Sequence, residues 1–204
     1  MSLPSGAGSK GPWGEQPALS DGVVDIAPFD VRHVSTIVGW DCDPEVQRWF
    51  DWSQTRAAGF DYEANARSTV EKKWAAWASG EEMVFVIADH RNGEGAGWCA
   101  MHPKGQGRGE ISYGLLPGYR GRGFASRGVM LLSGFAFEVL GFRRLELRVD
   151  ANNAQSRALA VRCRFVEEGI MRSYGEYERY EPLLGQRFDM VLYARLNDGR
   201  SRPS

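Results

Sequence analysis

Apolar residues along the chain fall into short continuous runs and longer periodic stripes. Three runs lie at 83–88, 97–101 and 111–116, each bounded by Gly, Asn or Pro. Runs of this length between turn residues are typical of strands, so we expect three consecutive antiparallel strands. The same reasoning predicts further strands at 23–26, 145–149, 165–171 and 188–196.

Helical periodicity is clearest between Tyr62 and Ala78, where apolar side chains recur at spacings of three and four residues. This stripe predicts an amphipathic helix, and residues 124–139 repeat the pattern. Asp30 and Asp43-Pro44 are favourable helix starts, because an Asp side chain caps free N–H groups and Pro suits the first turn. The sequence therefore predicts helices at 30–40, from 43, at 62–78, at 124–139 and at 154–163.

Strands and helices mixed along 204 residues predict a single α/β domain. The Gly-, Ser- and Pro-rich residues 1–20 are expected to form a flexible tail, because they offer too few apolar side chains to offset the entropy of ordering them. Residues 197–204 are expected to be a frayed C-terminus. The predicted folded domain spans 21–196.

Charge and composition narrow the function classes. Lys and Arg total 25 and Asp and Glu total 26, so the overall field predicts neither nucleic acid nor membrane as a partner. No signal sequence or long apolar span is visible, and the three cysteines and three histidines lack metal-ligand spacing. We expect a cytoplasmic protein without a bound metal.

The segment from Leu115 to Ala125 carries the most chemistry. It follows a predicted strand, opens a predicted helix, and reads Leu-Leu-Pro-Gly-Tyr-Arg-Gly-Arg-Gly-Phe-Ala. Glycines permit close backbone approach, a helix start offers free N–H groups, and two arginines add positive charge, a combination that favours phosphate. It is neither a Walker A loop nor a dinucleotide fingerprint, since Ser126 holds the third glycine position. The alternative is a turn with solvated arginines.

This loop resembles that of the GNAT superfamily of N-acetyltransferases, whose acetyl-CoA motif is Arg/Gln-x-x-Gly-x-Gly/Ala, here Arg120 to Ala125. The flanks are similar too: Glu110 to Pro117 looks like the family's fourth strand, Asn153 to Ser156 like its Asn-x-x-Ser helix, and Arg164 to Gly169 like a later strand. The order of segments resembles the branch that acetylates N-terminal amines of ribosomal proteins. Two positions depart from the pattern, with Arg127 in a region that usually carries Glu and Arg164 where Gly is usual.

The resemblance implies a mixed, mostly antiparallel twisted sheet, flanked by helices and splayed between its fourth and fifth strands. It also implies that acetyl-CoA, as cosubstrate, lies along the end of the fourth strand and on the helix start. The residues implied to bind it are Leu115, Leu116, Arg120, Gly121, Arg122, Gly123, Phe124, Ala125 and Asn153. An N–H near Leu115 is placed to polarise the thioester carbonyl.

The resemblance implies direct transfer of an acetyl group to a primary amine, and two residues are candidates for its proton steps. Glu110 begins the motif strand, where a carboxylate can deprotonate the amine, and Ser156, or else a nearby tyrosine, is placed to give the leaving thiolate a proton or a hydrogen bond. The alternatives are an exposed strand glutamate and a first-turn helix residue. Cys99 and Cys163 are expected to be buried rather than nucleophilic.

The amine acceptor is less defined. The aromatic segment Trp49 to Trp52 corresponds to the family's acceptor groove, where Asp41, Asp43 and Asp51 either attract a cationic amine or serve as helix caps. A protein N-terminus and small-molecule amines both fit, and dimers are frequent in the family, so a homodimer is left open. The competing interpretations are a non-catalytic acyl-CoA-binding module and a phosphate- or nucleotide-binding module.

Overall fold

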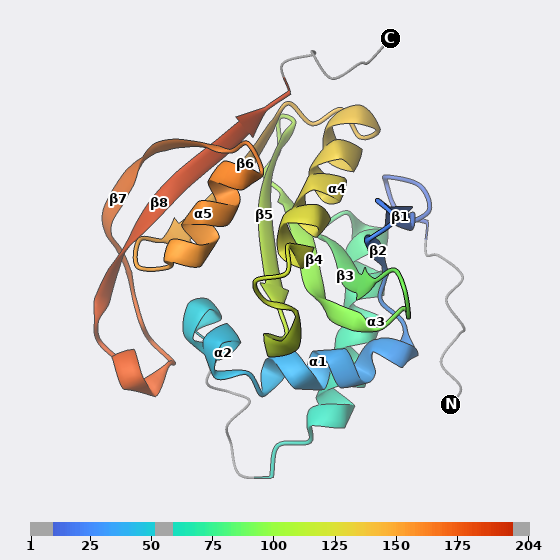
Figure 1. Ribbon diagram of the computed structural model, residues 1–204, viewed down its shortest axis with the longest axis horizontal. Coiled ribbons are helices and arrows are strands. Elements are labelled where there is room, and N and C mark those ends of the chain that lie inside the picture. Colours follow the sequence, from blue (N-terminus) through green and yellow to red (C-terminus); the bar gives the residue numbers. More distant parts are fainter. Residues whose placement is uncertain (1–9, 52–58, 198–204) are drawn as a thin grey trace.

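The structure is a computed structural model that describes residues 10–51 and 59–197 (Figure 1). Its strands form one eight-stranded sheet in the order β1-β2-β3-β4-β5-β6-β8-β7. The strands are β1 Leu19–Ser20, β2 Val24–Pro28, β3 Met83–Asp89, β4 Gly95–Pro103, β5 Arg108–Leu115, β6 Arg144–Asp150, β7 Val166–Glu176 and β8 Arg187–Leu196. The α-helices are α1 Val34–Asp41, α2 Pro44–Phe50, α3 Tyr62–Ser79, α4 Phe124–Glu138 and α5 Ala154–Arg162. Short 3-10 helices are η1 Val31–His33, η3 Pro117–Tyr119 and η4 Glu181–Leu183.

Two apolar cores lie on opposite faces of the sheet. Successive side chains of a strand point to opposite faces, and β3 shows this because Phe85 and Ile87 join one core while Val84 and Val86 join the other. The first core includes residues of α4 and α5, and the second includes residues of α1 and α3. In Figure 1, α4 and α5 lie in front of the sheet and α3 lies behind it. The predicted α/β domain is confirmed.

The pairing of β5 with β6 distinguishes this sheet, because it is the parallel pair among otherwise antiparallel neighbours. It covers only Arg108–Glu110 of β5 against Arg144–Glu146 of β6. Beyond these residues the two strands separate while each continues to its end. β5 contains the segment that resembles the family's fourth strand, so the splay that the resemblance implied between the fourth and fifth strands is present here between β5 and β6. The gap opens at Ile111 and Leu147.

Most predicted elements lie where the apolar pattern placed them. Asp43 caps α2 as expected, and its Oδ1 accepts hydrogen bonds from the N–H groups of Glu45 and Val46 at 2.8 and 3.1 Å. The helix expected at 30–40 begins instead with one 3-10 turn, because Asp30 and His33 cap that turn reciprocally. The strand expected at 165–171 extends to Glu176, since it pairs with β8 over almost its whole length.

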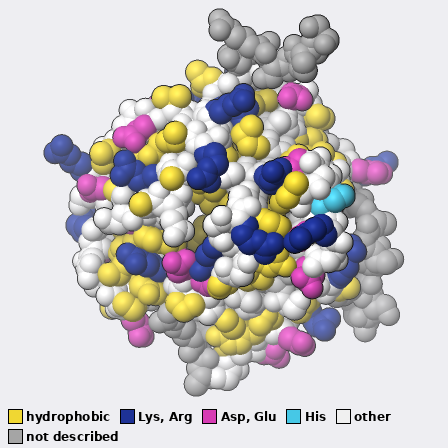
Figure 2. Space-filling model, viewed as in Figure 1, with side chains coloured by type: hydrophobic (Ala, Val, Ile, Leu, Met, Phe, Trp, Pro, Cys, Tyr) yellow, Lys and Arg dark blue, Asp and Glu magenta, His cyan; other side chains and the backbone are white. Residues whose placement is uncertain are grey.

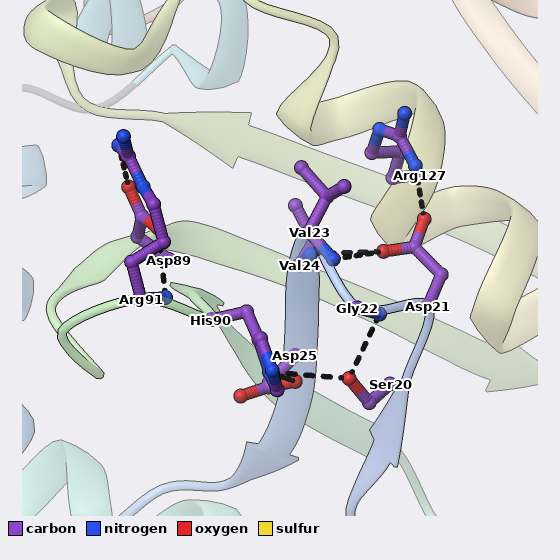
Figure 3. Close-up of polar contacts among 10 residues, drawn as sticks. All are labelled: Ser20, Asp21, Gly22, Val23, Val24, Asp25, Asp89, His90, Arg91 and Arg127. Atoms are coloured by element: carbon purple, nitrogen blue, oxygen red, sulfur yellow. Dashed lines mark hydrogen bonds and ion pairs between the residues drawn. The ribbon is translucent and has the colours of Figure 1, made fainter.

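The segment expected to be a tail is held in place from residue 10 onward. Trp13 packs edge-on against Trp77 with 5.2 Å between ring centroids, and β1 pairs with β2. Asp21 then joins this segment to α4, because its carboxylate accepts from Arg127 at 2.6 Å and from two backbone N–H groups (Figure 3). Residues 1–9 and 198–204 lie outside the described residues, so the domain limits stay a prediction.

Candidate active site

A cavity of about 890 Å³ occupies the gap between the splayed strands. Its walls are Glu110–Leu115 of β5, Leu147–Asp150 of β6, and residues of α2, α4 and α5. In Figure 2 this face is hollowed near its middle, with Lys and Arg side chains beside the hollow. The cavity is therefore lined from both faces of the sheet, by α2 on one side and by α4 and α5 on the other.

The loop before α4 presents unused hydrogen-bond donors to this cavity. Gly123 precedes α4 with a φ of 83°, and Gly121 has a φ of 72°, a left-handed conformation that favours glycine. Within the described residues, the N–H groups of 121–126 have no backbone acceptor, whereas the N–H of Arg127 donates to Gly123 at 3.1 Å. Free N–H groups at a helix start bind phosphate well, so this loop fits the pyrophosphate of a CoA-type ligand.

The residues that the resemblance assigned to acetyl-CoA divide into two groups. Those that line the cavity are Leu115, Arg120, Gly121, Gly123, Ala125 and Asn153. Those that do not are Leu116, Arg122 and Phe124. Phe124 is buried in the core beneath the loop, and the side chain of Leu116 packs on the other face of the sheet.

The backbone direction at the end of β5 explains why Leu115 and Leu116 differ. The N–H of Leu116 donates to the carbonyl of Ala96 at 2.8 Å, and therefore points toward β4. Because successive backbone groups alternate in direction, the N–H and C=O of Leu115 point into the gap. Leu115 thus offers a backbone N–H toward the cavity, and Leu116 does not.

Glu110 lies where β5 and β6 part, on the face opposite Ile111. Its side chain is about one-fifth exposed and pairs with Lys104 Nζ at 3.0 Å and with Arg148 Nη2 at 3.7 Å. Two cations therefore lie beside this carboxylate at the edge of the cavity. Arg148 itself lines the cavity and donates to the Tyr174 hydroxyl at 2.9 Å.

Ser156 and Asn153 lie together at the start of α5, on the α4 side of the gap. The Oδ1 atom of Asn153 caps the helix by accepting from the N–H of Ser156 at 3.0 Å. Ser156 is therefore a first-turn residue, as the structural alternative had it, and it also lines the cavity. The cap uses the oxygen of the Asn153 amide, and its NH2 group can donate to a ligand.

Tyr113 was not singled out from the sequence, yet it belongs to the same corner of the cavity. Its hydroxyl is buried beside the Ser156 side chain and makes no hydrogen bond of standard geometry among the described residues. Burial raises the pKa of the phenol, and the neighbouring Ser156 side chain opposes that rise. β5 mixes buried and partly exposed residues, so no sequence pattern would have marked a tyrosine there as a site residue.

Comparison with known proteins decides the family. Residues 24–166 match the family described as Acetyltransferase (GNAT) domain. The chain belongs to the GNAT acetyltransferase family. An uncharacterized N-acetyltransferase p20 from Bacillus licheniformis is 29% identical over 156 residues, which cover 76% of this chain and 82% of that protein. The chain is therefore an acetyl-CoA-dependent N-acetyltransferase.

Solved structures agree on the fold. The ribosomal-protein-S5-alanine acetyltransferase from Vibrio fischeri has a TM-score of 0.73 at 17% identity, covering 92% of this chain and 100% of that one. RimL, a ribosomal L7/L12 α-N-protein acetyltransferase in complex with coenzyme A, has a TM-score of 0.73 at 20% identity, covering 89% and 99%. At these identities the likeness establishes the GNAT fold, and the acceptor is a separate question.

The opposite wall of this acetyltransferase's cavity is formed by α2, which supplies Val46, Trp49 and Phe50. Asp51 ends the helix with a φ of 51°, and its carboxylate accepts from the N–H groups of residues 178–180 at 2.7–3.0 Å. These bonds tie α2 to the loop between β7 and β8. Trp52 lies outside the described residues.

The three aspartates near α2 are engaged in structural contacts. Asp43 and Asp51 cap the two ends of the helix, as the alternative interpretation proposed. Asp41 is buried, which raises the pKa of its carboxyl group, and it accepts from Asn65 at 2.8 Å. None of them lines the cavity, so Glu45, Glu110 and Asp150 are its carboxylates.

Covalent and metal chemistry find no support in the described residues. Cys99 and Cys163 are buried as expected, and burial raises the pKa of Cys163 to about 11, so neither is a ready thiolate nucleophile. No group of three or more His, Cys, Asp or Glu in residues 10–51 and 59–197 is placed to hold a metal ion. Every helix in those residues is too short or too polar to span a bilayer.

Proposed function

We propose that the cavity between β5 and β6 is the acetyl-transfer site, with acetyl-CoA on the α4 and α5 side and a primary amine on the α2 side. The observation that carries this proposal is the pair of open features at one place: unpaired strand edges from Ile111 and Leu147, and free N–H groups of residues 121–126. The strand edges present backbone N–H and C=O groups and the loop presents N–H groups, and an extended ligand with phosphates would pair with both.

The chain's residues take the following roles in this proposal. Backbone N–H groups from Gly121 to Ala125 hold the pyrophosphate, with Arg122 adding positive charge, and Phe124 and Leu116 support the loop and strand from beneath. The NH2 group of Asn153 donates to the pantetheine arm. The N–H of Leu115, which points into the gap, donates to the oxygen that becomes negative during transfer.

Acetyl-CoA supplies an acetyl group activated as a thioester, so a C–N bond forms as the C–S bond breaks. Glu110 accepts the proton that the amine loses, directly or through water. Ser156 donates a hydrogen bond to the leaving sulfur and stabilises the thiolate until it takes a proton from solvent. The Tyr113 hydroxyl beside Ser156 is a second donor at this place, because it is buried without an acceptor until a ligand provides one.

For the acceptor we propose a protein N-terminus or a small-molecule amine. The relatives named as acetyltransferases of ribosomal-protein alanine and of L7/L12 support the first class. An α-amine, with a reference pKa of roughly 7.7–8.0, is also more often neutral at physiological pH than a lysine amine near about 10.4. A screen for thiol release with peptides that begin with Ala or Ser, and with spermidine, distinguishes the two classes.

Thermal unfolding with acetyl-CoA, desulfo-CoA and ADP tests the site directly. At about a hundred times its dissociation constant, a bound ligand should add about 2.7 kcal/mol to the free energy of unfolding. We expect the two CoA compounds to stabilise the wild type and ADP to do so weakly. Equal stabilisation by ADP would favour a nucleotide-binding module, and stabilisation without any turnover would favour a non-catalytic one.

Gly123→Val should abolish this stabilisation. A Cβ at Gly123 meets no protein atom within 4 Å, so the new side chain would enter the space left for the ligand. Gly141→Val is the matched control, because Gly141 has a φ of 71° and similarly open surroundings but lies outside the cavity. Both variants carry the same backbone strain, and only Gly123→Val should lose the response to acetyl-CoA.

A further inference from the structure

Arg120 begins the acetyl-CoA motif, but its side chain turns away from the open N–H groups of the loop. Its Nη2 donates to Asp43 Oδ2 at 2.8 Å, and its Nη1 pairs with Glu45 Oε2 at 2.7 Å. Its Nε and Nη2 also donate to the carbonyl of Leu115 at 3.1 and 3.0 Å. One guanidinium therefore joins the phosphate loop, the gap-side end of β5 and the start of α2.

Asp43 makes this junction rigid because it bonds both α2 and Arg120. Its Oδ1 caps α2 while its Oδ2 takes the guanidinium, and its side chain is only 2% exposed. A buried aspartate with a cation on one oxygen and two N–H groups on the other has little freedom to move. Arg120 thus fixes the start of α2, the helix that carries Val46, Trp49 and Phe50 into the cavity wall.

The charge of Arg120 is already neutralised in this arrangement. Two carboxylates and a carbonyl engage all three of its nitrogens, so a phosphate would have to compete with short contacts already made to Asp43, Glu45 and Leu115. Arg122 is different: its side chain is 46% exposed, stacks over Tyr119 and Phe124, and approaches Asp89 only to 3.9 Å. Of the two loop arginines, Arg122 is the one that a phosphate can reach without breaking a short ion pair.

We propose that Arg120 is a positioning residue for the amine side of the site, which fixes α2 against β5, and that its side chain is not a phosphate ligand. This inference rests on the proposed function, since it presumes that α2 borders the amine site. It follows that acceptor binding should depend on Arg120, and CoA binding on Arg122 and the loop backbone.

The test compares Arg120→Met with its matched control Arg122→Met. We expect Arg120→Met to raise the amine KM by about tenfold or more, measured with the Ala or Ser peptide or the spermidine that wild type acetylates. The dissociation constant of Arg120→Met for CoA should stay within about twofold of the wild-type value. That of Arg122→Met should rise and depend less on salt concentration. A larger loss of CoA affinity in Arg120→Met than in Arg122→Met would overturn the proposal.

Hydrogen exchange gives a second readout that needs no acceptor. Arg120→Met should speed amide exchange in residues 44–50, whether or not CoA is bound, and Asp43→Asn, which keeps a capping oxygen, should do the same. Amide exchange in the double variant should be no faster than in either single variant, because both substitutions remove the same interaction. Unchanged exchange in α2 would overturn the proposal, whereas wild type that fails to bind CoA would overturn the proposed function alone.

Discussion

Two sides of the cavity are built by different means. The phosphate-loop side, residues 117–126, uses backbone N–H groups and glycines that are close together in the sequence. The hairpin side, α2 with residues 174–187, uses side-chain contacts across long stretches of chain, such as Asp51 to residues 178–180. A ligand shared by many proteins can be recognised by backbone, whereas a wall of packed side chains can differ between proteins. The first side is therefore readable from sequence and the second is not.

Glu110 lies between the two sides, and its replacement should have the largest effect. Glu110→Gln keeps the size of the side chain but cannot accept a proton, so kcat should fall by about 10²–10³-fold. CoA affinity should be unchanged, because Glu110 and the loop lie at opposite ends of β5. Steady-state kinetics and CoA titration check both expectations.

Glu146→Gln is the control for that substitution. Glu146 lies directly opposite Glu110 in the β5–β6 register, is similarly shielded, and pairs with Arg144 at 2.6 Å without lining the cavity. Its replacement should leave kcat within about twofold. If both variants lost activity equally, Glu110 would act through the structure of the strand pair and not as a base.

The fold was predictable because its signals are local. Apolar runs placed β3, β4 and β5, and the stripe after Gly123 placed α4 within one residue of its observed end. The splay between β5 and β6 came only from the family resemblance, since a strand's sequence does not say where its partner departs. β1 has two residues and pairs without any apolar run of its own, so no pattern could reveal it.

The candidate site was only partly predictable, and Arg120 shows why. The motif identified the residue, but its partners Asp43 and Glu45 lie more than seventy residues earlier in the chain. Capping explained Asp43 from the sequence, and nothing local indicated that its second oxygen meets Arg120. Tyr113 escaped notice for the same reason, because its role depends on a space between strands and not on a spacing of residues.

Asp51 offers a way to disturb the hairpin side alone. Asp51→Gly tolerates the left-handed backbone but removes the carboxylate that binds three N–H groups, so the free energy of unfolding should fall by about 2 kcal/mol. The amine KM should rise while CoA affinity stays constant. Asp51→Asn retains an acceptor oxygen, so its free energy of unfolding and its amine KM should lie between those of wild type and Asp51→Gly. A loss of CoA affinity in either variant would contradict the separation of the two sides.

Tyr113 provides a smaller test on the cofactor side. Its unsatisfied hydroxyl costs stability, so Tyr113→Phe should raise the free energy of unfolding of the ligand-free protein by about 1 kcal/mol. With acetyl-CoA bound, the gain should shrink, because the hydroxyl then has an acceptor to lose. Tyr177→Phe is the matched control, since its hydroxyl donates to Asp150 at 2.6 Å and its removal should destabilise the protein. Destabilisation by Tyr113→Phe without ligand would mean that the hydroxyl is already satisfied.

The smallest expected effect concerns Asp89, which borders the phosphate loop through Arg122. Hydrogen bonds from the Arg91 side chain and backbone hold the pKa of Asp89 at about 2, below its usual value of 3.8 (Figure 3). Because the folded-state pKa is depressed, the carboxylate stabilises the fold above pH 3.8 and this contribution is lost as pH falls toward 2. Asp89→Asn should therefore flatten the pH dependence of stability in that interval, which urea unfolding at a series of pH values would measure. Arg91→Met should flatten it in the same way, and curves parallel to wild type in both variants would show that Asp89 titrates normally.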